Sequence, residues 1–173
     1  EEHYEQLREY FHQFAKESSE KMQAPMCYCK NMSVDAILHY YAGQLEDAGV
    51  SFHHSIEVPQ KMKITDLDIC RIFGNLLENA VRAVKADKET EEPYVNCICR
   101  VRMGKLLIDI ENSYSGEVRR NGDVFYSTSH SGQGIGTASV SKTAEKYGGY
   151  ADFEASEGVF RANVFIPLEN SGS

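Results

Sequence analysis

The sequence predicts an α+β fold, a two-layer α/β sandwich in which helices pack on a sheet. Helical periodicity dominates the first half of the chain and strand patterns the second, without regular β-α-β alternation, which disfavours a doubly wound fold. The 173 residues, 42% of them apolar, are enough for one globular domain with a full core.

The first segments of the chain are expected to be helical. Residues 3–22 carry a heptad-like apolar stripe that ends before Pro25, because the residue preceding a proline avoids helical backbone. This stripe fits packing on the following domain and packing on a second copy of itself equally well. A second helix is expected to follow Asn31 and to stop at Gly49, and residues 50–58 are expected to form a strand.

The later segments complete the sandwich. Residues 113–133 are dense in Gly and Ser with little periodicity, and a long loop of this kind is usually functional. The elements expected around it are a helix over 66–86, strands over 94–103 and 105–112, a helix over 135–146, and a hairpin over 150–155 and 159–166.

Charge and composition exclude several classes of function. A net charge of −8 argues against a general nucleic-acid or acidic-membrane binder, but local amides and a metal could still hold a nucleotide. The sequence has no visible signal peptide and no apolar run of membrane-spanning length. It opens inside a helical pattern without an initiator Met, so we expect an excised piece of a longer protein.

The five cysteines are expected to be reduced thiols in the core or on the surface. They include two Cys-x-Cys pairs, at Cys27 and Cys29 and at Cys97 and Cys99. An odd number of cysteines fits no disulfide framework, and no His cluster completes a metal site beside either pair.

An Asn-x-x-x-Asn motif lies on the helix expected over 66–86. At about 100° per residue, Asn75, Asn79 and Arg82 gather on the side opposite the apolar residues, with Glu78 at the edge of this group. Such a stripe is either a solvated helix face or a magnesium site, since Mg²⁺ takes oxygen ligands and Arg82 could meet a phosphate.

A glycine-rich turn precedes the helix expected over 135–146. In Gly132-Gln133-Gly134-Ile135-Gly136 the glycines allow backbone to approach a ligand, and the helix behind them offers free N–H groups to an anion. The turn follows a loop rather than a strand and lacks the Gly-Lys-Ser/Thr of a P-loop, so it matches neither common nucleotide motif.

Asn112 ends the core-facing row of the strand expected over 105–112. A polar side chain at this position needs a partner, which could be an adenine edge or the backbone of a strand-end turn.

Taken together, these motifs resemble the ATP-binding domain of sensor histidine kinases, of the Bergerat-fold ATPase superfamily. The resemblance covers about 31–168 and implies a mixed, mostly antiparallel sheet with helices on one face. It implies that Asn79 binds Mg²⁺ and that Asn75 orients the γ-phosphate or a water, with Glu78 in the same box. Asn75, Glu78 and Arg82 are the catalytic residues it implies. Gly132, Gly134, Ile135 and Gly136 would belong to the phosphate-binding turn.

Departures from the family pattern point to one subgroup. Asn112 stands at the adenine-reading aspartate, Tyr114 at the first glycine of that box and Gly116 at the second. The Asn-Ser version of the box resembles the peptide-responsive quorum-sensing kinases of Gram-positive bacteria. Where those kinases carry a phosphate-directed Lys, this chain has His130.

The resemblance implies a catalytic part that binds Mg·ATP and donates the γ-phosphoryl group to a histidine on a partner helical domain. Residues 1–24 resemble the second helix of a dimerisation and phosphotransfer hairpin, followed by the ATP domain over 25–170 and a tail over 171–173. The phosphoacceptor histidine would then precede Glu1. The resemblance also implies a homodimer, a response regulator, and a membrane-bound parent with this domain on the cytoplasmic side. It implies no binding of nucleic acid.

Two other functions fit the same residues. An anti-sigma-factor-type serine kinase of the same superfamily would need no upstream histidine. A non-catalytic nucleotide-sensing or dimerisation module would fit if Asn112 and His130 had removed turnover.

Overall fold

A computed structural model describes residues 27–115, 119–121, 124–126 and 135–168. The helix expected over 3–22, the domain boundary at residue 24 and the tail over 171–173 lie outside this part of the chain and stay predictions.

The domain is built on a five-stranded mixed sheet with strand order β1-β2-β3-β7-β6. Strand β1 pairs with β2 in parallel, and each of the other neighbouring pairs is antiparallel. The strands of this sheet are β1 (Ser51–Ile56), β2 (Tyr94–Arg102), β3 (Lys105–Ser113), β6 (Tyr150–Ser156) and β7 (Val159–Pro167).

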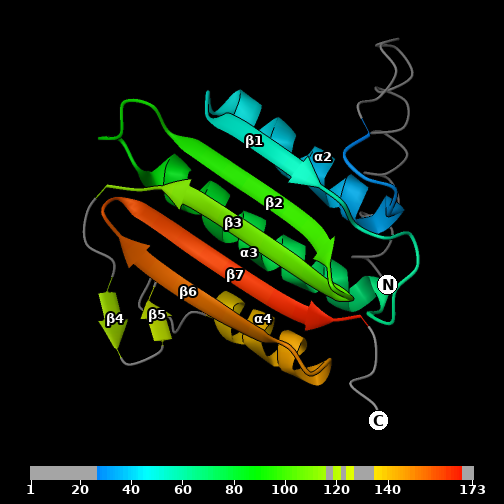
Figure 1. Cartoon of the computed structure of the whole chain (residues 1–173). Coiled ribbons are helices and arrows are strands. Elements are labelled where there is room, and N and C mark those ends of the chain that lie inside the picture. The colour runs from blue at the N-terminus through cyan, green and yellow to red at the C-terminus, as the bar shows by residue number, and fades with distance from the viewer. Residues whose placement is uncertain (1–26, 116–118, 122–123, 127–134, 169–173) are drawn as a thin grey trace, which may run out of the picture.

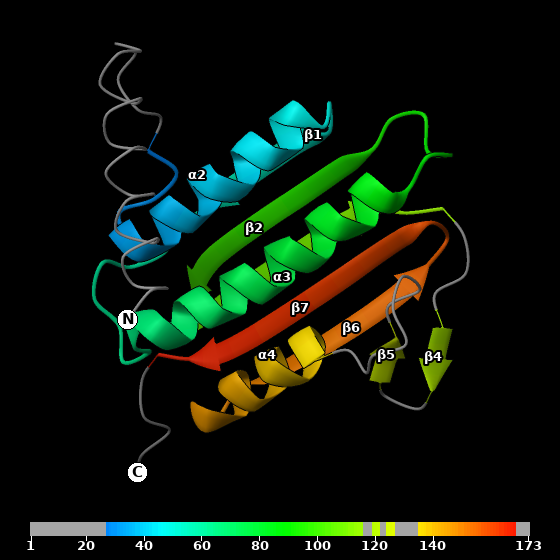
Figure 2. The same cartoon turned by 180° about the vertical axis from the view of Figure 1, so that it is seen from behind.

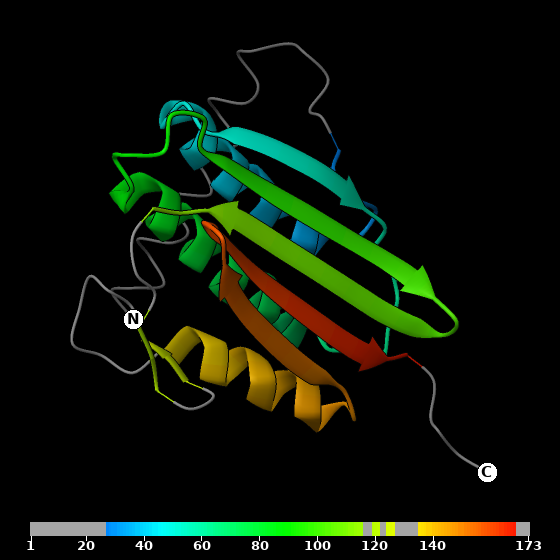
Figure 3. The same cartoon turned by 60° about the vertical axis from the view of Figure 1, so that its left-hand side comes forward.

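Helices α2 (Met32–Asp47), α3 (Asp66–Ala86) and α4 (Ile135–Lys146) cover one face of the sheet, as Figures 1 and 2 show from opposite sides. Figure 3 shows the same two layers nearer to edge-on. Side-chain caps begin two of the helices: Asn31 accepts from the Val34 N–H, and Thr65 accepts from the Asp68 N–H. The predicted α+β two-layer sandwich is confirmed.

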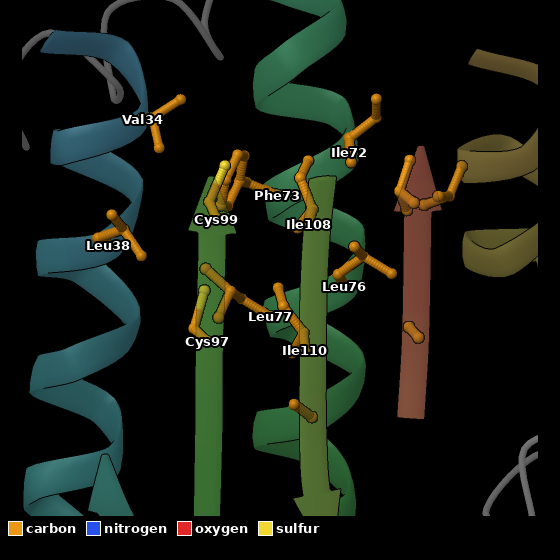
Figure 4. Close-up of a cluster of buried hydrophobic side chains, with 14 of the residues drawn as sticks. Val34, Leu38, Ile72, Phe73, Leu76, Leu77, Cys97, Cys99, Ile108 and Ile110 are labelled. Carbon is orange, nitrogen blue, oxygen red and sulfur yellow. The ribbon is translucent and has the colours of Figure 1, made fainter. Parts of the chain in front are cut away.

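The core lies between the helices and the sheet. Alternation along β3 buries Leu106, Ile108 and Ile110, which face the apolar side of α3. Figure 4 shows this layer, including Phe73 and Leu77 of α3. Three of the cysteines are buried in it as thiols, namely Cys29, Cys97 and Cys99, while Cys27 is exposed and Cys70 half-buried.

The long loop expected over 113–133 needs a correction. Arg119–Asn121 (β4) and Val124–Tyr126 (β5) pair as a small antiparallel sheet of their own. In the sequence Gly122 and Asp123 separate these strands, and Gly-Asp is a hairpin signal, but the three-residue flanks are too short to show strand alternation. Apart from this hairpin, the elements predicted within the described residues agree with the observed ones to within two residues at each end.

A close backbone approach explains the glycine pair after α4. A Cβ on Gly149 would lie 2.0 Å from the Phe165 carbonyl oxygen, so only glycine lets the chain turn into β6 here. Gly148 has a φ of +74°, which glycine adopts without strain.

A buried carboxylate docks α4 on α3. Asp68, which is 2% exposed, accepts from Lys146 Nζ at 2.6 Å and Tyr147 Oη at 2.7 Å, both at the end of α4. Arg71 Nη1 donates to the other carboxylate oxygen at 2.8 Å. Hydrogen bonds with Lys146, Tyr147 and Thr65 lower the pKa of Asp68 to about 2, against the opposing effect of burial.

Asp68→Asn is expected to destabilise the domain by about 2 kcal/mol at pH 7, because the folded carboxylate has a depressed pKa. A depressed folded pKa gives stability that is present above the unfolded value, 3.8, and is lost as pH falls toward about 2. The difference in urea unfolding free energy between wild type and variant should therefore shrink over that range. The exposed Asp66 of the same turn supplies the control Asp66→Asn. A difference that does not change with pH would contradict the assignment.

Candidate nucleotide site

The asparagine motif lies on the solvent side of α3, as predicted. Asn75 and Asn79 are half-buried, whereas Glu78 and Arg82 are exposed. The opposite side of the helix is buried along its length. Its buried apolar residues are Ile69, Ile72, Phe73, Leu76, Leu77, Ala80, Val81 and Val84.

The first turn of α4 lies directly against this motif. A Cβ on Gly136 would lie 3.1 Å from Asn79 Nδ2 and 3.4 Å from the Oδ1 atoms of both Asn75 and Asn79. Since Gly136 is the second residue of α4, its backbone belongs to the turn whose N–H groups lack helical partners. The structure thus brings two carboxamides and a helix N-terminus together. Ile135 opens the same helix.

The orientation of Asn75 leaves its carboxamide oxygen available as a ligand atom. Its amide nitrogen donates to the Arg71 carbonyl oxygen, one turn earlier, at 2.7 Å. The carboxamide oxygen, near the Gly136 backbone, is therefore the atom left for another partner. A pair of neutral oxygens beside a helix N-terminus fits a hydrated Mg²⁺ that carries a phosphate.

Glu78 lies on the other edge of the motif, toward α2. Burial, followed by the charge of Glu78, raises the pKa of Tyr41 in α2 to about 12. This places the Glu78 carboxylate within electrostatic range of Tyr41, whereas the described contacts of Gly136 are with Asn75 and Asn79. The expected roles of Glu78 and of the exposed Arg82 in catalysis stay predictions.

Asn112 ends the buried row of β3 with 1% exposure, as predicted. Its amide nitrogen donates to the Ser113 carbonyl oxygen at 2.9 Å. The carboxamide oxygen is then the atom that can accept from an amino group such as that of adenine. The strand-end bond to the backbone and a base-reading role are therefore compatible.

Four of the predicted site residues lie outside the described part of the chain. They are Gly116, His130, Gly132 and Gly134, and their roles stay predictions.

The sequence analysis missed Asp87, which caps the C-terminal end of α3. Its carboxylate accepts from the backbone N–H and the hydroxyl of Ser115, which is three residues beyond Asn112. A partner 28 residues away in the sequence leaves no local pattern. The sole signal was a carboxylate placed directly after a helix that already carried a motif.

Comparisons with known proteins agree with this fold. The fold is that of the catalytic domain of histidine kinase ThkA, which matches with a TM-score of 0.60 and 16% identity over 80% of this chain and 92% of that chain. The mycobacterial sensor histidine kinase MprB matches with a TM-score of 0.58 and 18% identity over 78% of this chain and 93% of that chain.

Full-length ShkA in complex with AMPPNP matches with a TM-score of 0.57 and 15% identity, over 82% of this chain and 30% of that chain. A search of curated proteins by sequence finds no match. A family model described as the GHKL domain matches residues 63–167. The chain therefore belongs to the GHKL family of ATP-binding domains.

Within the described ranges, no helix combines the length and the apolar character needed to cross a membrane.

Gly136→Ala is expected to weaken binding of a fluorescent ATP analogue in the presence of Mg²⁺ by about tenfold, because the new methyl group would displace the Asn79 carboxamide. Gly74→Ala is the matched control, since Gly74 is next to Asn75 and a Cβ there meets nothing within 4 Å. The control should keep its affinity and gain about 0.5–1 kcal/mol of stability. Equal affinities for the two variants would show that Gly136 does not border the ligand.

Proposed function

We propose that this domain binds Mg·ATP and donates its γ-phosphoryl group to a histidine on a partner helical domain, as the catalytic part of a sensor histidine kinase. The observation that carries this proposal is the meeting of Gly136 with Asn75 and Asn79. Membership of the GHKL family and the fold shared with histidine kinase catalytic domains support it.

Within the proposed site, Asn79 holds Mg²⁺ through its carboxamide oxygen and Asn75 orients the γ-phosphate or a water. The turn of Gly132, Gly134 and Gly136 offers backbone N–H groups to the phosphates, helped by the positive end of the α4 dipole. Bound Mg²⁺ would neutralise part of the charge on the phosphates.

Recognition of the base falls to Asn112, whose carboxamide oxygen accepts from the adenine amino group. Arg82 supplies outer charge, as does His130 when it is protonated. In phosphoryl transfer such a domain does little covalent chemistry, because positioning of the reactants and neutralisation of charge supply most of the rate acceleration.

The partners and the setting are part of the same proposal. Residues 1–24 contribute to a dimerisation hairpin, the phosphoacceptor histidine precedes Glu1, and a response regulator receives the phosphate. The parent is a membrane sensor of the peptide-responsive quorum-sensing subgroup, a placement supported by the Asn-Ser sequence at Asn112.

Asn79→Ala is expected to abolish the Mg²⁺-dependent part of ATP binding, because the substitution removes the proposed metal ligand. The affinity of the variant for a fluorescent ATP analogue should be the same with Mg²⁺ as with EDTA. Asn163→Ala changes the same residue type on β7, in register with Asp109 and Asp152, and serves as the control. Retention of the wild-type response to Mg²⁺ in Asn79→Ala would refute the ligand assignment.

A longer chain that includes the residues before Glu1 is expected to acquire label from γ-³²P-ATP as acid-labile phosphohistidine, whereas residues 1–173 alone should acquire none. Acid-stable phosphoserine on a partner protein would instead identify the serine-kinase function. Binding of ATP without transfer in the longer chain would identify a non-catalytic nucleotide-sensing module.

A further inference from the structure

The four residues from Asn112 to Ser115 are each held by a separate contact. The Asn112 amide nitrogen donates to the Ser113 carbonyl oxygen, and the Ser113 hydroxyl accepts from the Tyr94 N–H at 3.0 Å. The Tyr114 N–H donates to the Gly158 carbonyl oxygen at 2.9 Å. Ser115 is exposed, so its hydrogen bonds to Asp87 hold a residue that packing does not.

Asp87 holds this segment from the end of α3. Its Oδ2 accepts from the Ser115 N–H at 2.7 Å and from the Thr90 hydroxyl at 2.5 Å, and its Oδ1 accepts from the Ser115 hydroxyl. Oδ1 also accepts from the N–H groups of Glu89 at 2.9 Å and Thr90 at 3.2 Å. Both oxygens are therefore used, and they join the end of the helix to the end of β3.

We propose that Asp87 is a positioning residue for base recognition, holding the segment that begins at Asn112 in fixed relation to α3, which carries Asn79. This inference rests on the proposed function, because it assigns the base to Asn112 and the metal to Asn79. Asp87 touches neither ligand; it acts through Ser115 and sets where the base-reading segment lies relative to the metal-binding helix.

The arrangement requires a carboxylate. An amide at residue 87 would keep one acceptor oxygen and would turn an NH₂ group toward donors that now meet an oxygen. Backbone N–H groups can only donate, so either orientation of an asparagine loses bonds: NH₂ in place of Oδ2 would face the Ser115 N–H, and NH₂ in place of Oδ1 would face the N–H groups of Glu89 and Thr90. Burial opposes ionisation of Asp87, but hydrogen bonds led by those from Ser115 and Thr90 lower its pKa well below the usual value. The group is thus a full acceptor at neutral pH.

The test compares two ligands that share phosphates and differ in the base. In isothermal titration, Asp87→Asn should weaken Mg·ATP by about tenfold, the equivalent of losing one charge-assisted hydrogen bond, and should leave Mg·triphosphate within about twofold of wild type. Glu92→Gln removes a charge from the same connection, at an exposed residue, and is the matched control. Asn112→Ala should reproduce the pattern of Asp87→Asn.

Equal losses for both ligands would mean that Asp87 supports the fold alone, and unchanged affinities for both would overturn the inference. If wild-type protein binds neither ligand, the proposed function itself fails. Should Asp87→Asn unfold, Ser115→Ala, which removes one of the hydroxyl donors, tests the same contact and should also weaken Mg·ATP selectively.

A measurement on the nucleotide-free protein tests the contact between Asp87 and Ser115 independently of its effect on ligand binding. Amide hydrogen exchange at Ser115, followed by NMR, should accelerate in Asp87→Asn by about tenfold and should not change in Glu92→Gln. Unchanged exchange at Ser115 would show that the Asp87 contact does not hold the segment in solution, and the inference would be withdrawn.

Discussion

The antiparallel docking of α4 on α3 is the constraint on which the proposed site depends. Asp68 fixes one end of this helix pair through Lys146 and Tyr147, and the other end then brings Gly136 against the asparagine motif. A buried carboxylate with one charged partner removed would be costly, so the pair can shift little along the helix axis. An ionic contact at one end of α4 thereby sets the spacing between carboxamides and helix N-terminus at the other.

The proposed site has two halves, one for the metal and one for the base, that are held by different means. The metal half depends on packing between helices, and the base half depends on the end of β3, where Asn112 is buried and Ser113 is bonded to the neighbouring strand. Nothing in the sheet alone would fix one half relative to the other. Asp87 lies where the two meet, since it caps α3 and accepts from Ser115. In the proposed site, the relative position of metal and base therefore depends on the helix end as well as on the core.

Periodicity was enough to predict most of the fold and part of the site. Alternation in β3 identified the buried face that ends at Asn112, and helical spacing separated Asn75 and Asn79 from the core. What failed was long-range: Lys146 and Tyr147, which donate to the Asp68 carboxylate, are 78 and 79 residues away. Asp68 stood one turn before Ile72 on the apolar stripe, and a buried carboxylate there needs charged or polar donors. Arg71 is a local donor, but no local pattern could identify Lys146 and Tyr147. The β4–β5 hairpin was missed because three-residue strands give too little alternation to recognise.

An acidic domain that binds a polyanion must supply positive potential locally. The chain carries a net charge of −8, and Arg71, one turn before Asn75, is already paired with Asp68. Within the described part of the site, the contributions left are the N-terminus of α4 and the exposed Arg82, both modest in water. A neutral carboxamide adds no charge, so in the proposed site Asn79 and Asn75 would act through the ion that they position and not through a charge of their own. In the proposed site the metal must therefore carry most of the neutralisation, which makes the position of its ligands, rather than their charge, the property that the helix pair has to preserve.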